Sequence, residues 1–240
     1  SKNKGLLSFI YLTIKHVFYV KKVRSYYNKI KLKNLSLSNS YVYFPLHHQP
    51  ELTTRPQAEY FDNQIHAINY LRRFLPSKIS IYIKEHPRQL NSLSSDLRQF
   101  NTRDKKFYDE IKLLKNVYFV DENFNSSTLM KNCEFVATIK GTSSWEAICL
   151  GKPSLNFSLN WHNDFEASKS IKKEDDMINF IRNYKNLNQN VIAQKQKIFL
   201  KEIEKKIFNI VVSPIEYNSL DVEEREKYKK NVKDVMDALI

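Results

Sequence analysis

Three stretches of this sequence carry side chains suited to binding a phosphorylated ligand. The first, residues 45–55, contains two imidazoles, His47 and His48, and the carboxylate of Glu51. A histidine titrates near neutral pH and can act as an acid, a base or a phosphate contact. The alternative is a proline-kinked loop whose histidines only bond backbone groups, and the spacing alone slightly favours it. We expect no metal, because no third ligand stands at a diagnostic spacing.

The second stretch, residues 84–88, gathers positive charge in Lys84, His86 and Arg88. Pro87 follows His86 and biases it toward an extended backbone, away from helix. An extended His86 would aim its ring above the preceding strand, where an anionic ligand would bind. The alternative is an ordinary solvated loop, so this signal is weak alone and gains weight from following an apolar strand.

The third stretch, residues 140–153, predicts a strand, a turn and a helix. Gly141 allows a tight turn, and Thr142 or Ser143 can cap a helix that begins near Ser144. The start of a helix presents free N–H groups and a positive dipole end, which together bind phosphate.

Glu146 stands about one turn into this helix, where a carboxylate can accept two hydrogen bonds from ribose hydroxyls. The alternative is a capping motif on a core helix without a ligand. We favour a ligand site, because Gly141 and Gly151, two of only three glycines in the chain, bracket the helix. For Trp145 and Trp161 we expect packing in the core or at an interface.

Short apolar runs separated by helical patterns predict the sheet that must position these stretches. The runs are rich in β-branched and aromatic residues, as buried parallel strands are. They are residues 41–46, 79–84, 117–120, 135–139 and 154–157. We predict an α/β fold, a doubly wound, mostly parallel Rossmann-like sheet with flanking N- and C-terminal helices. Ligands bind at the carboxyl ends of such strands, so the three stretches should meet at one edge.

Positive charge is concentrated at the N-terminus. Residues 1–40 hold nine basic and no acidic side chains of a chain whose net charge is +13. We expect residues 1–40 to form a basic helix and linker, residues 41–160 the Rossmann-like domain, and residues 161–240 helices that pack on it. The basic segment suits peripheral contact with an anionic membrane surface. Nucleic-acid binding is the least favoured interpretation.

Composition excludes several classes of protein. The three glycines, Gly5, Gly141 and Gly151, stand too far apart for a Walker loop or a G-x-G-x-x-G fingerprint. Two cysteines cannot supply a disulfide framework or a four-thiolate zinc site. Cys133 and Cys149 both fit buried, inert thiols. Residues 5–14 are uncharged but too few to span a bilayer, which takes about 20 residues. Free thiols and the missing export signal predict a cytoplasmic location.

Four segments together resemble bacterial capsule and surface-polysaccharide biosynthesis proteins. They are YFPLHHQPE (43–51), IYIKEHP (81–87), FYDEIKLLKNVYFV (107–120) and GTSSWEAICLGKP (141–153). In order and spacing they are similar to glycosyltransferases of the GT-B fold, related to the Kdo transferases of capsule assembly. The resemblance covers residues 41–158 and implies the C-terminal, donor-binding half of such an enzyme.

The resemblance implies a nucleotide-sugar donor, CMP-linked in the favoured interpretation, and no cofactor. In similar CMP-sugar transferases a His-Pro pair and a Ser/Thr pair hold the donor phosphate and cytidine, which implies these roles for His86–Pro87 and Ser143–Ser144. Glu146 would bind the donor ribose. His47 and Glu51 are the candidate catalytic residues, lining the cleft where the glycosyl carbon meets a glycan or glycolipid acceptor.

The family's acceptor-side domain has no counterpart in these motifs, so the donor half would need an N-terminal domain or a partner subunit. Residues 156–164 also depart from the glycine-containing turn of the family. Two alternatives stay open: a UDP-sugar 2-epimerase-like enzyme, and a non-catalytic, donor-like subunit of an assembly complex. The residues expected to bind the nucleotide are Lys84, His86, Pro87, Arg88, Gly141, Thr142, Ser143, Ser144 and Glu146.

Overall fold

The computed structural model describes residues 2–50, 59–91, 103–163, 165–204 and 220–239. The chain divides into two units, residues 1–196 and 197–240. The first unit contains every described strand and the candidate site. The second contains the end of helix α7 (Gln189–Glu204) and helix α9 (Val222–Leu239).

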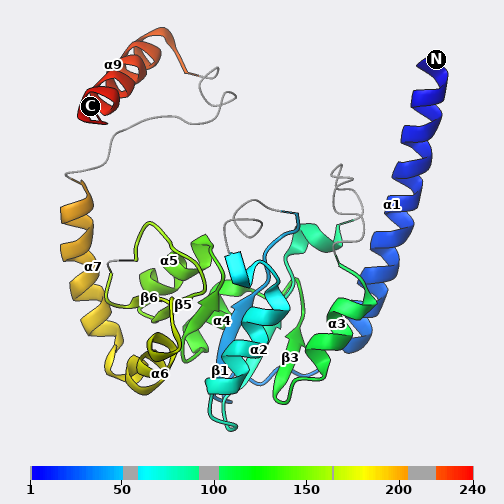
Figure 1. The fold of residues 1–240 in the computed structure, drawn as a ribbon, viewed down its shortest axis with the longest axis horizontal. Coiled ribbons are helices and arrows are strands. Elements are labelled where there is room, and N and C mark those ends of the chain that lie inside the picture. The colour runs from blue at the N-terminus through cyan, green and yellow to red at the C-terminus, as the bar shows by residue number, and fades with distance from the viewer. Residues whose placement is uncertain (1, 51–58, 92–102, 164, 205–219, 240) are drawn as a thin grey trace. The chain divides into compact units, whose positions relative to one another are not determined.

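Six strands form one parallel sheet in the first unit (Figure 1). They are β1 (Tyr41–Pro45), β2 (Ser80–Lys84), β3 (Val117–Val120), β4 (Val136–Thr138), β5 (Ser154–Asn156) and β6 (Ser168–Ser170). Their order is β3-β2-β1-β4-β5-β6, and each neighbouring pair is parallel. This is the strand order of the doubly wound nucleotide-binding fold, whose topological switch point lies between β1 and β4. The predicted fold class is confirmed.

Strand β6 is missing from the sequence prediction, which had five strands. Its three residues are polar, and the central side chain, Lys169, is exposed. A strand at the edge of a sheet needs no continuous apolar run, because it is covered less than the central strands. The apolar-run criterion therefore cannot detect it.

Helices and short 3-10 turns connect the strands. In the first unit they are α1 (Lys2–Ile30), η1 (Glu59–Phe61), α2 (Gln64–Phe74), η2 (Pro87–Leu90), α3 (Lys105–Lys112), α4 (Ser126–Asn132), α5 (Thr142–Cys149), α6 (Glu174–Asn183), η4 (Tyr184–Asn186) and the first part of α7. Side-chain oxygens of Asn63, Asp104 and Asn125 accept hydrogen bonds from first-turn amides of α2, α3 and α4. Such N-caps fix where each helix begins.

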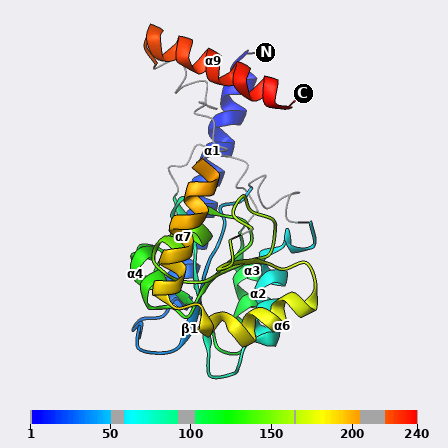
Figure 2. The ribbon, with the colours of Figure 1, turned by 90° about the vertical axis from the view of Figure 1, so that its left-hand side faces the viewer.

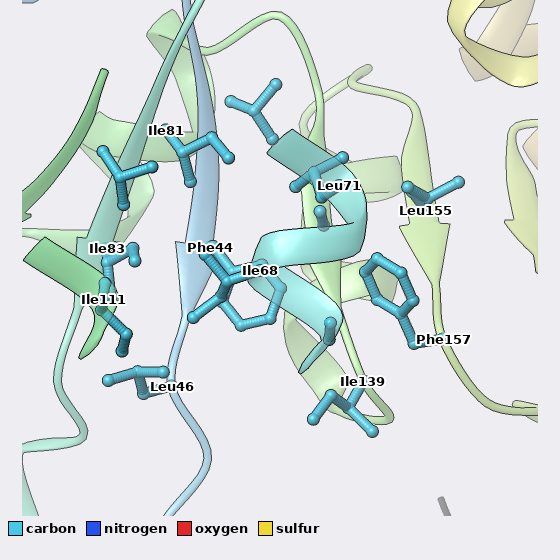
Figure 3. Close-up of a cluster of buried hydrophobic side chains, with 14 of the residues drawn as sticks. Phe44, Leu46, Ile68, Leu71, Ile81, Ile83, Ile111, Ile139, Leu155 and Phe157 are labelled. Atoms are coloured by element: carbon cyan, nitrogen blue, oxygen red, sulfur yellow. The ribbon is translucent and has the colours of Figure 1, made fainter. Parts of the chain in front are cut away.

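Alternating side chains along the strands build a core on each face of the sheet. Val42 and Phe44 face α2, α3, α6 and the second half of α1, whereas Tyr41 and Tyr43 face α4 and α5. Figure 3 shows the first core, with Phe44 against Ile68 of α2. In Figure 2, α2, α3 and α6 lie on one side of the sheet and α4 lies on the other.

The second half of α1 belongs to the core of the sheet domain. Tyr27 is fully buried, and its hydroxyl donates a hydrogen bond to the carbonyl of Val120 at 2.6 Å. Just after the helix, the amide of Leu32 donates to the carbonyl of Phe119 at 2.8 Å. This segment therefore covers the outer edge of β3.

The first half of α1 has a different surface. It extends past the sheet (Figure 1), and its large apolar side chains are exposed. Among the side chains described there, the exposed ones are Phe9, Ile10, Tyr11, Leu12, Ile14 and Phe18. Across the described ranges, no helix has both the length and the apolar character needed to cross a membrane.

The two cysteines differ. Cys133 is buried as expected, and burial raises the pKa of its thiol to about 12. The expectation for Cys149 is wrong, because its side chain is exposed in the last turn of α5. Ala147 and Ile148 supply the buried face of that turn, so an apolar helix pattern does not by itself place every position inside.

Candidate functional site

A cavity of about 300 Å³ lies at the carboxyl ends of β1, β2 and β4, beside the switch point of the sheet. All three predicted stretches contribute to its wall. The lining residues are Pro45, Leu46, His47, His48, His86, Thr138, Lys140, Gly141, Thr142 and Ser143. The described lining contains three imidazoles, one ammonium group and three hydroxyls, but no carboxylate. This composition suits an anionic ligand.

His47 fastens the loop after β1 to the loop after β4. Its Nε2 lies 3.0 Å from the hydroxyl of Thr138 and accepts a hydrogen bond from the amide of Lys140 at 3.3 Å. Its own amide donates to Oε1 of Gln64 at 2.9 Å, which ties the same loop to the start of α2. Because Nε2 accepts from an amide, the proton of the neutral ring lies on Nδ1.

Position 141 favours glycine because a larger side chain would crowd the ring of His47. Its φ of −161° is extended backbone that any residue adopts, so the tight-turn explanation is wrong. A Cβ at this position would lie only 3.0 Å from Cε1 of His47. The glycine therefore allows the imidazole to pack directly against the backbone that enters α5.

The start of α5 opens toward the cavity. The helix begins at Thr142 with Gly141 as its N-cap, so the expected capping by Thr142 or Ser143 is wrong. Gly141 has no side chain that could satisfy the first-turn amides, in contrast to the caps of α2, α3 and α4. Uncapped amides at the positive end of a helix dipole can bind a phosphate.

His86 is oriented by the turn that follows β2. Its backbone is extended, as Pro87 predicts, and its Nδ1 accepts a hydrogen bond from the amide of Arg88 at 3.2 Å. The neutral ring therefore carries its proton on Nε2, which makes this atom a hydrogen-bond donor. The rings of His48 and His86 lie 5.4 Å apart, so imidazoles from two loops share one wall.

A buried ion pair supports both histidine loops. Glu85 accepts hydrogen bonds from Arg103, from the hydroxyl of Tyr108 and from the amide of His86. Arg103 also donates to the carbonyl of His47 at 2.9 Å. Neither Glu85 nor Arg103 was among the predicted site residues, because nothing in their sequence spacing links a residue before α3 to the end of β2.

Lys84 lies away from the cavity, on the face of the sheet covered by α4. Its side chain is buried, and Nζ donates to the hydroxyl of Ser126 at 2.6 Å. Within the described ranges, no carboxylate oxygen lies within 4 Å of this nitrogen. Burial lowers the pKa of the ammonium group.

Ser144 also points away from the cavity. Its hydroxyl donates to the carbonyl of Gly141 at 2.9 Å and lies 3.0 Å from Nε2 of His162, while Nδ1 of His162 lies 2.8 Å from the hydroxyl of Ser168. This buried series of hydrogen bonds joins α5 to β6. Burial lowers the pKa of His162.

Thr142 and Glu146 form an exposed pair on the first turn of α5. The hydroxyl of Thr142 donates to Oε1 of Glu146 at 2.9 Å. Glu146, like Pro87 and Arg88, is exposed and lies outside the cavity wall. Glu51 falls outside the described residues.

The structure thus brings His47, His86, Gly141, Thr142 and Ser143 together. It also places in the wall His48, which the first stretch named without a role, and it adds Thr138 and Lys140. Thr138 and Lys140 directly flank the end of β4, so the rule that ligands meet strand ends could have found them. Among the described residues, no cluster of three or more His, Cys, Asp or Glu side chains is arranged to hold a metal ion.

The sequence matches no protein-family model and no curated protein. Solved structures match it at low identity. The KpsC beta Kdo 2,7 transferase of Thermosulfurimonas dismutans is 14% identical with a TM-score of 0.43, over 70% of this chain and 50% of that one. A UDP-GlcNAc 2-epimerase of Methanocaldococcus jannaschii, in complex with UDP-GlcNAc and UDP, is 16% identical with a TM-score of 0.44, over 80% and 52%.

A UDP-GlcNAc 2-epimerase of Neisseria meningitidis bound to UDP-GlcNAc is 19% identical with a TM-score of 0.39, over 70% of this chain and 44% of that one. The chain spans about half the length of the solved structures it matches.

Proposed function

We propose that this chain binds a nucleotide sugar, CMP-linked in the favoured case, as the donor half of a glycosyltransferase for bacterial surface polysaccharide. One observation carries the proposal: the cavity at the β1/β4 switch point joins three imidazoles, Lys140 and an uncapped helix start, without a carboxylate in its described lining. A phosphate is the ligand that such a wall favours. The four sequence motifs that resemble GT-B enzymes include most of this wall.

The donor phosphate lies at the start of α5 in this proposal. The amides of Thr142 and Ser143 would bind it together with the Nε2 proton of His86 and the ammonium group of Lys140. Glu146 stands one turn further along the helix, with one oxygen held by Thr142, and would accept hydrogen bonds from ribose hydroxyls.

Catalysis would be mainly electrostatic. As the bond between the sugar and the phosphate breaks, negative charge develops on the departing phosphate, and donors already oriented toward it stabilise that charge. His47 and Glu51 remain the predicted catalytic residues, and the proposed acceptor is a glycan or glycolipid. The bonds from Nε2 of His47 to Thr138 and Lys140 add a second role, which is to hold the turn before α5.

The exposed half of α1 suits a surface that is both apolar and anionic. Phe9, Ile14 and Phe18 are exposed there, and residues 1–40 contain nine basic and no acidic side chains. Apolar side chains with flanking lysines bind the interface of an anionic bilayer. We propose peripheral membrane contact through this helix, and flotation with vesicles of anionic rather than neutral lipid tests it. Equal flotation of a Phe9→Ser/Phe18→Ser variant would contradict it.

A calorimetric titration with CMP, CDP, UDP and GDP tests the donor site. We expect selective binding of CMP, and a loss of at least about tenfold in affinity for His86→Ala, since a hydrogen bond to a charged group contributes about 1.5–3 kcal/mol. His66→Ala, at an exposed position of α2, is the matched control. Selective binding of UDP with formation of an epimer would identify the epimerase-like alternative. Absence of binding to all four nucleotides would contradict the proposal and favour a non-catalytic subunit.

A further inference from the structure

The two tryptophans of the chain lie against each other at the surface. The ring centroids of Trp145, on α5, and Trp161, in the loop after β5, are 4.7 Å apart with 54° between the ring planes. Trp161 is 61% exposed. An indole this exposed contributes little to the core, so core packing does not explain it.

The loop that carries Trp161 is held by its own hydrogen bonds. The side-chain amide of Asn160 donates to Oδ1 of Asn156 at 2.8 Å, and the backbone amide of Asn160 donates to Oδ1 of Asn163 at 2.9 Å. His162, next to Trp161 in the chain, is anchored between Ser144 and Ser168. The loop that carries the exposed indole is therefore held in place, and little conformational entropy is lost when a ligand stacks on the indole.

Trp145 belongs to the helix whose start forms the proposed phosphate position. Trp145 follows Thr142 by three residues on α5, so the two are neighbours on the helix surface, about one turn apart. Thr142 lines the cavity, and Glu146 lies in the same first turns of the helix. A nucleotide whose phosphate binds the start of α5 could thus extend its ribose past Glu146 and its base toward the indoles.

We infer that Trp145 and Trp161 form a stacking platform for the nucleobase of the bound nucleotide. The inference rests on the proposed donor site and adds the subsite for the base. A platform of this kind accepts any base, because every base has a π-face. It therefore raises the affinity for the nucleotide without distinguishing cytosine from uracil. Other groups of the site would have to distinguish the two bases.

Intrinsic fluorescence gives a direct test, because both tryptophans of the chain belong to the platform. The ligands are CMP, UMP and ribose 5-phosphate, which lacks a base, with calorimetry run in parallel. We expect CMP and UMP to change the fluorescence and ribose 5-phosphate to bind without changing it. In Trp161→Ala, the affinity for CMP should fall roughly 5- to 150-fold while that for ribose 5-phosphate stays the same. Leu159→Ala, a 54% exposed neighbour, is the matched control and should bind CMP as the unmodified chain does.

Three outcomes would overturn the platform. If Trp161→Ala binds CMP as tightly as the unmodified chain, the donor site stands and the platform is wrong. An equal loss of CMP and ribose 5-phosphate affinity would show that Trp161 acts on the phosphate region instead of stacking on a base. If no phosphate compound binds the unmodified chain, the proposed function fails and the platform fails with it. Thermal melting of both variants confirms that they are folded.

Discussion

The guanidinium group of Arg103 donates from Nε to Oε2 of Glu85 at 3.0 Å, and the two side chains are only 4% and 0% exposed. Each partner also holds one histidine loop of the site: Arg103 bonds the carbonyl of His47, and Glu85 bonds the amide of His86. Neither residue of the pair lines the cavity. The pair therefore fixes the distance between two loops that line the cavity.

Removing one partner of the Glu85–Arg103 pair should destabilise the folded protein. Arg103→Met leaves the carboxylate of Glu85 buried without its cation, and we expect the free energy of unfolding to fall by about 3–5 kcal/mol. Urea denaturation measures the loss. Arg88→Met removes an exposed arginine from the neighbouring turn and should change stability by less than about 0.5 kcal/mol. Similar losses for the two variants would contradict the structural role of the pair.

The contact between Gly141 and His47 predicts a coupling between two substitutions. Gly141→Ala places a Cβ 3.0 Å from the imidazole and should displace it, weakening nucleotide binding several-fold. In a chain that already carries His47→Ala the added methyl has room, so the second substitution should cost little more. A double-mutant cycle on CMP affinity measures this non-additivity. Additive losses would show that the methyl acts elsewhere.

Because His162 is buried, we expect the protein to lose stability in acid. Burial lowers its pKa in the folded state, so the unfolded chain takes up a proton at a higher pH than the folded chain does. The contribution of His162 to the free energy of unfolding is thus complete above its ordinary pKa of 6.5 and decreases as the pH falls below that value. Urea denaturation followed by tryptophan fluorescence, between about pH 7.5 and about pH 5, measures the slope.

Two variants assign this slope to His162. His162→Gln should flatten the pH dependence, whereas His66→Gln, at an exposed position, should preserve it. An unchanged slope in His162→Gln would assign the acid sensitivity to other groups. The same variant also tests how firmly the loop after β5 is anchored to α5.

Replacing Lys84 should affect the stability of the fold and the affinity for the nucleotide in opposite directions. Lys84 is 7% exposed, and its ammonium group donates a hydrogen bond to the hydroxyl of Ser126. Lys84→Met removes a poorly solvated charge and should raise the free energy of unfolding by about 1 kcal/mol near neutral pH. If the charge of Lys84 attracts the donor phosphate, the same variant should bind CMP more weakly. A variant that is both less stable and unchanged in affinity would contradict both expectations.

The central strands and the loops at their ends were predictable because both depend on local patterns. Phe44 and Ile83 belong to short apolar runs, and such runs mark strands that are covered on both faces. Because parallel strands end at one edge, the stretches around His47, His86 and Gly141 had to meet there. The fold class and the neighbourhood of the site follow from these two facts.

The partners of individual side chains were not predictable, because they depend on distant contacts. Ser143 and Ser144 are adjacent and chemically alike, but one lines the cavity and the other bonds the buried His162. A helix turns about 100° per residue, so only the packing of α5 on the sheet decides which of the two faces the cavity. The pairing of Glu85 with Arg103 likewise depends on where α3 packs.

The hydrogen bond from Leu32 to Phe119 has a consequence for the solubility of this protein. It occupies part of the outer edge of β3. The buried Tyr27 lies between the ends of β2 and β3, where its hydroxyl donates to the carbonyl of Val120 and accepts from the amide of Glu85. An uncovered strand edge is a template on which another chain can add a strand. A chain shortened to begin at Tyr41 would therefore expose a pairing surface as well as apolar side chains, and it should self-associate before it loses its sheet. We therefore expect the segment before β1, which contains Tyr27 and Leu32, to reduce aggregation.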